Sequence, residues 1–172
     1  MRIAIDAKQY FNGPISTRTI LQNLLPKLFE LYNENEWLVF FDKKDQHLGS
    51  PFQQQNIRII YVPTLTNMFS NLFILPQQIA KLKPDVTLFM MFTPLFRKSR
   101  TAVFIHDVLF REYPQYFTRT EKLYFWPISR LTPKADRIIC TSEYVSGKLL
   151  EYQFASTKSK IDIIPLGISE IF

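Results

Sequence analysis

The chain has 172 residues, 47% of them hydrophobic and 21% charged, a composition that supports one folded domain and excludes a disordered chain. A single cysteine, Cys140, excludes an intrachain disulfide framework and a cysteine-rich zinc site. The formal net charge of +6 is concentrated in residues 97–137, which indicates an anionic partner such as phosphate, nucleic acid or a lipid headgroup. An ordinary solvated surface explains this excess equally well.

Short apolar runs alternate with helical patterns in the first half of the chain. Arg2–Asp6 predicts a buried strand, and the next segment predicts a helix capped by Ser16 or Thr17. Because Pro26 lies inside this helical pattern, we expect a kink or a break there. The remaining predicted elements of this half are the strands Trp37–Phe41 and Ile57–Val62, a loop over 43–56 between them, and a helix over Asn67–Leu82 that Pro84 ends.

The second half continues the alternation. Its predicted strands are Val86–Met90, Thr101–His106, Arg137–Thr141 and Ile161–Ile164. One predicted helix is capped by Thr118 and interrupted at Pro127, and another is capped by Ser142 and ends near Gln153. Continuously apolar strands are typical of parallel sheets covered on both faces. Alternating strands and helices therefore predict a doubly wound, mostly parallel α/β sheet.

The loop after the first strand is a candidate phosphate site. Ligands bind such sheets beyond the carboxyl ends of the strands, and residues 12–18 lead from that edge into a helix N-terminus. Backbone N–H groups there can hold a phosphate, with Arg18 as the counter-charge. The segment matches neither GxGxxG nor a Walker A loop, so a classical dinucleotide or P-loop site is not expected. A helix start without any ligand explains the segment equally well.

His106 is the candidate catalytic residue. It follows a predicted buried strand at the ligand edge, where an imidazole can donate a hydrogen bond or accept a proton. We interpret residues 141–143 as a capped helix start and Cys140 as a core residue. The sequence has no Asp-x-Asp pair for a divalent metal and no GxSxG elbow.

A series of segments carries a family resemblance. In order they are MRIAIDA (1–7), NLL (23–25), NEWLVFF (35–41), LPQQIAKLKPDV (75–86), IHDV (105–108), PQYF (114–117), KADRIICTSEY (134–144), IDIIPLGI (161–168) and Phe172. Together they resemble the N-terminal domain of a family-4 glycosyltransferase of the GT-B fold and the mannosyltransferase type. The closing stretch, made of 134–144, 161–168 and Phe172, is the most specific part of the match.

The resemblance implies a two-domain enzyme made of two Rossmann-like halves. Residues 1–172 would form the acceptor-side half, and a C-terminal domain beyond this chain would bind the nucleotide sugar. The implied reaction moves a hexose, with mannose as the first candidate, to a glycan or a lipid-linked acceptor. The resemblance also implies a retaining mechanism without a metal or a cofactor. The alternative is a non-catalytic module that binds a glycan or a protein.

The resemblance assigns roles to individual residues. His106 matches the histidine that contacts the transferred sugar, and Asp107 follows it as a substrate-binding residue. Relatives have a glycine-rich loop near the donor diphosphate, but here Ser16, Thr17 and Arg18 take those places and only Gly13 lies nearby. These four are the candidate donor-phosphate residues. The side chains of Ser16, Thr17 and Arg18 are expected to hinder close backbone approach, which favours the binding-module alternative.

Localisation is predicted from what surrounds these motifs. The sequence shows no signal peptide and no run of 18 apolar residues, so we expect a cytoplasmic protein. Residues 64–75 are apolar for a helix start, and residues 111–130 mix aromatic with basic side chains. Both favour peripheral contact with an anionic membrane at the inner face of the cytoplasmic membrane, unless the aromatics pack on the sheet instead. No nucleic-acid-binding signature is present, so no nucleic acid partner is expected.

Overall fold

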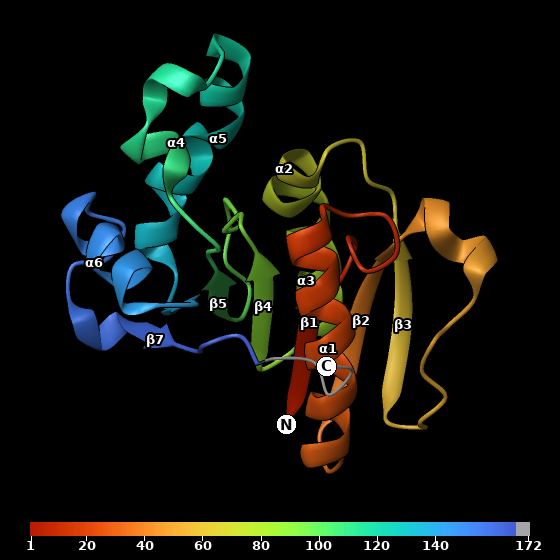
Figure 1. Cartoon of the computed structure of the whole chain (residues 1–172). Coiled ribbons are helices and arrows are strands. Elements are labelled where there is room, and N and C mark those ends of the chain that lie inside the picture. The colour runs from red at the N-terminus through yellow and green to blue at the C-terminus, as the bar shows by residue number, and fades with distance from the viewer. Residues whose placement is uncertain (168–172) are drawn as a thin grey trace.

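In the computed structural model, which describes residues 1–167, seven strands form one parallel sheet in the order β3-β2-β1-β4-β5-β6-β7 (Figure 1). The strands are β1 (Arg2–Asp6), β2 (Glu36–Asp42), β3 (Ile57–Val62), β4 (Val86–Met90), β5 (Arg100–Phe104), β6 (Arg137–Cys140) and β7 (Ile161–Ile163). This confirms the predicted parallel α/β fold. The chain direction across the sheet reverses between β1 and β4, so the switch point where ligand crevices open lies there. The motif residues Ile168 and Phe172 lie outside the described residues.

Helices cover both faces of the sheet. They are α1 (Ile15–Leu31), α2 (Asn67–Phe69), α3 (Leu75–Leu82), α4 (Leu109–Glu112), α5 (Arg119–Leu131) and α6 (Glu143–Glu151). Helix α1 packs on one face, where its buried residues Leu25 and Phe29 join a cluster with Trp37 of β2. Helices α3, α5 and α6 contribute to a second cluster on the opposite face. The sheet is therefore doubly wound.

Helix α1 corrects two predictions. It begins at Ile15, after Pro14 at the N-cap position, so Ser16 and Thr17 lie inside the helix and neither caps it. Proline sets a φ that suits a helix start, which explains the earlier beginning. Of the kink or break expected at Pro26, the break is wrong, because the helix continues to Leu31, and the kink stays a prediction. The buried residues on both sides of Pro26 outweigh the hydrogen bond that a proline removes.

Helix α5 likewise continues through an internal proline. The expected interruption at Pro127 is wrong, since the helix runs from Arg119 to Leu131 with Pro127 buried. Its start is as predicted: the Thr118 hydroxyl accepts from the Glu121 N–H at 3.2 Å, and the Glu121 carboxylate accepts from the Thr118 N–H at 2.8 Å. This reciprocal pair is a capping box.

The predicted helix over 67–82 forms as α2, a π-helical turn at Ser70–Ile74 and α3 in succession. The Thr66 hydroxyl caps it by accepting from the Phe69 N–H at 3.1 Å. Lys83 ends it in the left-handed region with φ 50°, just before Pro84. The π-turn is the one feature of this segment that the apolar pattern did not predict.

Several other strand and helix ends differ from the predictions by one or two residues, and two differences are structurally important. Residues Lys43–Leu48, inside the predicted loop, form a 3-10 helix, and the Asp42 carboxylate accepts from the Lys44 N–H at its start, at 3.0 Å. Strand β5 ends at Phe104, so His106 lies beyond the last strand residue rather than within the strand. This places His106 at the open edge of the sheet.

Candidate active site at the carboxyl edge of the sheet

Polar side chains from the end of β1, the segment after β5 and the first turn of α1 lie at the carboxyl edge of the sheet. Asp6 ends β1 beside the end of β4, whose Met90 N–H donates to the Asp6 carboxylate at 3.4 Å. His106 follows the end of β5, and Thr17 lies in the first turn of α1. These residues surround the switch point between β1 and β4.

His106 is held by Thr17. Its Nε2 lies 3.1 Å from the Thr17 hydroxyl, which is buried in the first turn of α1. The ring also packs against Phe104, with centroids 5.0 Å apart. Burial lowers the pKa of His106, and the nearby Asp107 carboxylate only partly opposes this effect. The imidazole is therefore neutral at pH 7, with its Nε2 oriented by α1.

Asp107 has a local role in the structure. Its carboxylate accepts a hydrogen bond from the Leu109 N–H at 3.1 Å, at the point where α4 begins. This bond fixes the chain as it leaves the sheet edge after His106. The predicted substrate contact of Asp107 stays a prediction.

The four candidate residues of the predicted phosphate loop lie in different surroundings. A Cβ at Gly13 would lie 2.4 Å from the Cβ of Gln9, so only glycine fits this turn. Ser16 is exposed, whereas Thr17 is turned towards His106. Arg18 is half-buried, and within residues 1–167 no carboxylate lies within ion-pair distance of its guanidinium. Phosphate binding by these residues stays a prediction.

A buried polar cluster lies beneath this edge, and the sequence pattern missed two of its three members. The Lys8 ammonium donates to the Asp6 carboxylate and to the Asn71 side-chain oxygen. The Asn71 amide donates to Asp6 at 2.8 Å and to the Met90 carbonyl at 3.2 Å. Asp6 and Lys8 are 2% and 4% exposed, and Asn71 is fully buried. Pairing within the cluster is what makes burial of these charges tolerable.

This cluster ties three elements together. Burial lowers the pKa of Lys8, while the Asp6 carboxylate favours its charged form. The hydrogen bonds join the end of β1, the end of β4 and the π-turn that carries Asn71. The cluster thus fixes the chain segment that leads from β1 towards Thr17. The sequence could have indicated a pairing of Asp6 with Lys8, because they are two residues apart at the end of a buried strand. The position of Asn71 could not be predicted in this way, because it depends on the π-turn.

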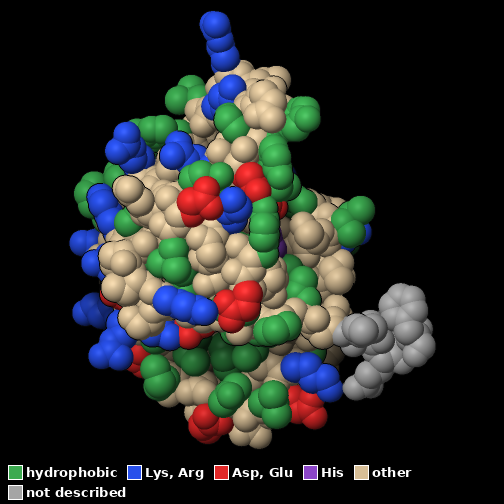
Figure 2. Space-filling model, turned by 60° about the vertical axis from the view of Figure 1, so that its left-hand side comes forward, with side chains coloured by type: hydrophobic (Ala, Val, Ile, Leu, Met, Phe, Trp, Pro, Cys, Tyr) green, Lys and Arg blue, Asp and Glu red, His purple; other side chains and the backbone are tan. Residues whose placement is uncertain are grey.

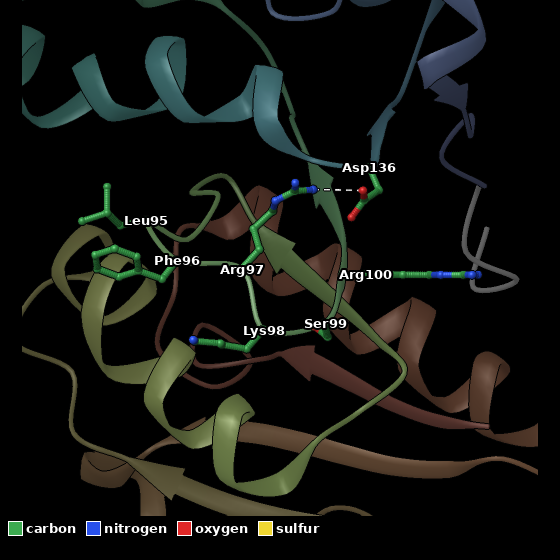
Figure 3. A pocket seen from close by; sticks show the side chains of 7 residues that line it. All are labelled: Leu95, Phe96, Arg97, Lys98, Ser99, Arg100 and Asp136. Atoms are coloured by element: carbon green, nitrogen blue, oxygen red, sulfur yellow. Dashed lines mark hydrogen bonds and ion pairs between the residues drawn. The ribbon is translucent and has the colours of Figure 1, made fainter.

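A surface hollow lies at the other edge of the sheet. It is lined by residues of the β4–β5 connection and by Asp136, and Arg97 is directed at the Asp136 carboxylate, 2.9 Å away (Figure 3). Asp136 also accepts from the Thr101 N–H at 2.8 Å. Because β5 and β6 begin here, the hollow lies at the amino ends of the strands, away from His106. It is not part of the candidate site.

Residues 1–167 contain neither a cluster of metal ligands nor a membrane-spanning helix. In the part of the chain that the structure describes, no group of three or more His, Cys, Asp or Glu side chains could hold a metal ion. Over the same residues, no helix combines the length and the hydropathy needed to cross a bilayer.

The geometry defines a class of protein: a doubly wound, Rossmann-like α/β domain with polar side chains gathered at its topological switch point. Residues 38–170 match the family model described as Glycosyltransferase Family 4, which covers most of the chain. The chain therefore belongs to glycosyltransferase family 4, and its fold is consistent with the N-terminal domain of the GT-B architecture. A search of curated proteins found no significant match.

Proposed function

We propose that this domain forms the acceptor side of a retaining, metal-independent hexosyltransferase. The substrates would be a nucleoside diphosphate sugar, with mannose as the first candidate sugar, and a glycan or lipid-linked acceptor. The observation that carries this proposal is His106, which is neutral and held by Thr17 at the carboxyl edge next to the switch point.

His106 would bind a hydroxyl of the transferred sugar. A neutral imidazole whose Nε2 is occupied by Thr17 has Nδ1 as its second hydrogen-bonding atom. The charge that develops on the leaving diphosphate would be stabilised by the N-terminus of α1 and by Arg18, which has no carboxylate partner among the described residues. These interactions gain strength as charge separates, so they favour the transition state over the bound substrates.

The test is His106→Ala in the enzyme completed by its donor-binding domain. A hydrogen bond used in the transition state is worth about 3 kcal/mol, so turnover should fall roughly a hundredfold while the fold is kept. His47→Ala is the matched control, because His47 is the other histidine and is exposed on the 3-10 helix. A variant with unchanged turnover would remove His106 from the site. Binding of a glycan without any turnover in the parent would favour the binding-module alternative.

We further propose that a second, C-terminal domain supplies the donor site. Transfer by residues 1–172 alone should then be negligible, and adding the second domain should restore it. The measurement is release of nucleoside diphosphate from a panel of nucleotide sugars. Rates from the isolated chain near those of an intact enzyme would contradict a two-domain enzyme.

The proposed location is the cytoplasm, with peripheral contact to an anionic membrane surface. On and beside α5, Tyr116, Leu123 and Trp126 are 80%, 72% and 55% exposed, as a membrane contact requires. Phe125 instead packs against Phe110, with ring centroids 5.2 Å apart. Some aromatic and apolar side chains of the predicted stretch 111–130 are therefore exposed, and others pack in the core.

The other predicted membrane stretch, 64–75, also keeps apolar side chains at the surface. Leu65 is 76% exposed, and the half-exposed rings of Phe69 and Phe73 contact each other at 5.0 Å between centroids. Co-sedimentation with vesicles tests the membrane proposal for both stretches. Binding should rise with anionic lipid, fall with salt, and weaken in Arg119→Glu/Lys122→Glu, since each cation near such a surface adds about 1 kcal/mol. No binding at low salt would contradict it.

A further inference from the structure

A groove of about 550 Å³ lies between α5 and the C-terminal end of α6, and it shares no residue with the carboxyl-edge site. Figure 2 shows the face that carries α4, α5 and α6, with Lys and Arg side chains gathered along its left margin. The groove is lined by Phe110, Arg111, Pro114, Lys122, Trp126, Ser129, Arg130, Pro133, Tyr152 and Gln153. Its lining thus combines cations with aromatic rings and contains no carboxylate.

The three cations of the groove are Arg111, Lys122 and Arg130. No carboxylate within residues 1–167 lies within 4.0 Å of any of their charged nitrogens. The acids nearby are already engaged: Glu112 accepts from the Tyr144 hydroxyl, and Glu151 pairs with Lys148 at 2.9 Å. The groove therefore carries a positive charge that its own surroundings do not neutralise.

Aromatic rings hold two of these cations, Arg111 and Arg130, without cancelling their charge. The Arg130 guanidinium carbon lies 5.7 Å from the ring centroid of Trp126, and that of Arg111 lies 5.8 Å from Tyr152. A guanidinium held against a ring loses less side-chain entropy when an anion binds. Its planar set of N–H donors matches the oxygens of a phosphate.

The rim of the groove carries an amide in an unusual backbone position. Gln153 has φ 60°, in the left-handed region that glycine adopts at least cost. A side chain is nevertheless present at this helix end, and it lines the groove. Gln153 adds an uncharged amide side chain to a lining that also contains Arg111 and Arg130, which suits a ligand with both phosphate and hydroxyl groups.

We propose that this groove binds the phosphate group of a phosphate ester. Three cations without carboxylate partners disfavour a cationic or neutral ligand, and the concave, ring-lined surface disfavours simple counter-ion adsorption. Arg111 and Arg130 bind the phosphate oxygens, Lys122 adds charge, and Gln153 contacts the esterified part. The ester can be a soluble phosphate or a phospholipid headgroup, and this ligand site is independent of transfer chemistry at His106.

Trp126 provides the readout. It lines the groove, whereas the other tryptophan, Trp37, is 2% exposed in the core. Tryptophan fluorescence is followed during titration with glycerol phosphate, and separately with vesicles of phosphatidylcholine alone or mixed equally with phosphatidic acid. The variants are Arg111→Gln and Arg130→Gln, with Arg58→Gln as the matched control, because Arg58 is an exposed arginine on β3 that does not line the groove and lies outside both predicted membrane stretches.

The expected result is saturable binding that weakens about tenfold in Arg111→Gln and in Arg130→Gln and is nearly unchanged in Arg58→Gln. Saturation by glycerol phosphate identifies a soluble ester site, and a response to phosphatidic acid vesicles alone identifies a lipid headgroup site. Equal weakening in all three variants would overturn the proposal, since it would show non-specific adsorption. So would the absence of binding to both probes by the folded parent, with the fold checked by circular dichroism.

Discussion

Lys8 and Arg130 are both cations, yet their surroundings are opposite. Lys8 is 4% exposed and donates to Asp6 and Asn71, whereas Arg130 is exposed, contacts the Trp126 ring and has no carboxylate partner in the described part of the chain. A buried charge needs a fixed partner, so Lys8 holds strand ends in place. An exposed, unpaired charge contributes little to folding and is free to meet a ligand. Burial and pairing thus separate positioning cations from binding ones.

The sharpest test of this comparison is Lys8→Met. It leaves the Asp6 carboxylate buried without its counter-charge, which should destabilise the fold by about 3–5 kcal/mol. Lys98→Met is the matched control on the exposed β4–β5 connection and should change stability by less than about 0.5 kcal/mol. Urea denaturation measures both. The double variant Asp6→Asn/Lys8→Met should recover part of the loss, and equal stability of the two single lysine variants would contradict the structural role of Lys8.

Helix α5 extends the comparison to apolar side chains. Phe125 packs against Phe110 and Phe117, with ring centroids 5.2 and 6.0 Å away, while Leu123 is 72% exposed. Phe125→Ala should therefore cost about 2–3 kcal/mol, and Leu123→Ala less than about 0.5 kcal/mol. Thermal unfolding of the two variants checks this. A larger loss from Leu123→Ala would mean that this surface is covered in solution.

The capping box tests an exposed charge that does stabilise the fold. The hydrogen bonds from Thr118 lower the pKa of the exposed Glu121 carboxyl. Thr118→Ala removes the cap and should cost about 1 kcal/mol, measured by urea denaturation. Thr120→Ala, two residues on at an exposed position, is the control and should be close to neutral. Equal effects would show that the cap is not formed in solution.

The smallest expected effect is the pH dependence due to His106. Because burial lowers its pKa, the folded protein binds a proton at His106 less readily than the unfolded chain does. Stability should therefore be fully present above about pH 6.5, the ordinary histidine value, and should fall as the pH drops below it. Denaturation across this range should show a shallower slope in His106→Gln. An unchanged slope would mean that His106 is solvated like a free histidine.

Sequence predicted the strands well because apolar residues predominate in each of them, as is typical of buried parallel strands. It placed the start of α1 too late because Ser16 and Thr17 are good caps, whereas the helix begins at Ile15, after Pro14, without a side-chain cap. Pro26 and Pro127 were assigned too much weight, since packing on the sheet outweighs one lost hydrogen bond. The local sequence pattern indicates the hydrogen bond that a proline removes, but it does not indicate the tertiary contacts that compensate for this loss.

The candidate site was only partly accessible to the same reasoning. His106 was found because its place after a strand is local information. Its contact with Thr17 joins residues 89 positions apart, and Asn71 reaches Asp6 across 65 positions, so neither follows from a spacing rule. Such contacts become readable only once the strand order is known.

The π-turn at Ser70–Ile74 makes the length of its helix more important than its composition. Successive residues of a regular α-helix are about 100° apart around the axis, and a π-turn accommodates one residue more than that geometry allows. Removing a single residue here would restore a regular helix and turn Asn71 away from Asp6, because α3 is anchored by the buried Ile79. Substitutions at the half-exposed Phe73 keep the number of residues in the turn, so they leave the direction of Asn71 around the helix axis unchanged. In alignments with relatives, this turn is therefore where a one-residue gap would mark the loss of the buried cluster.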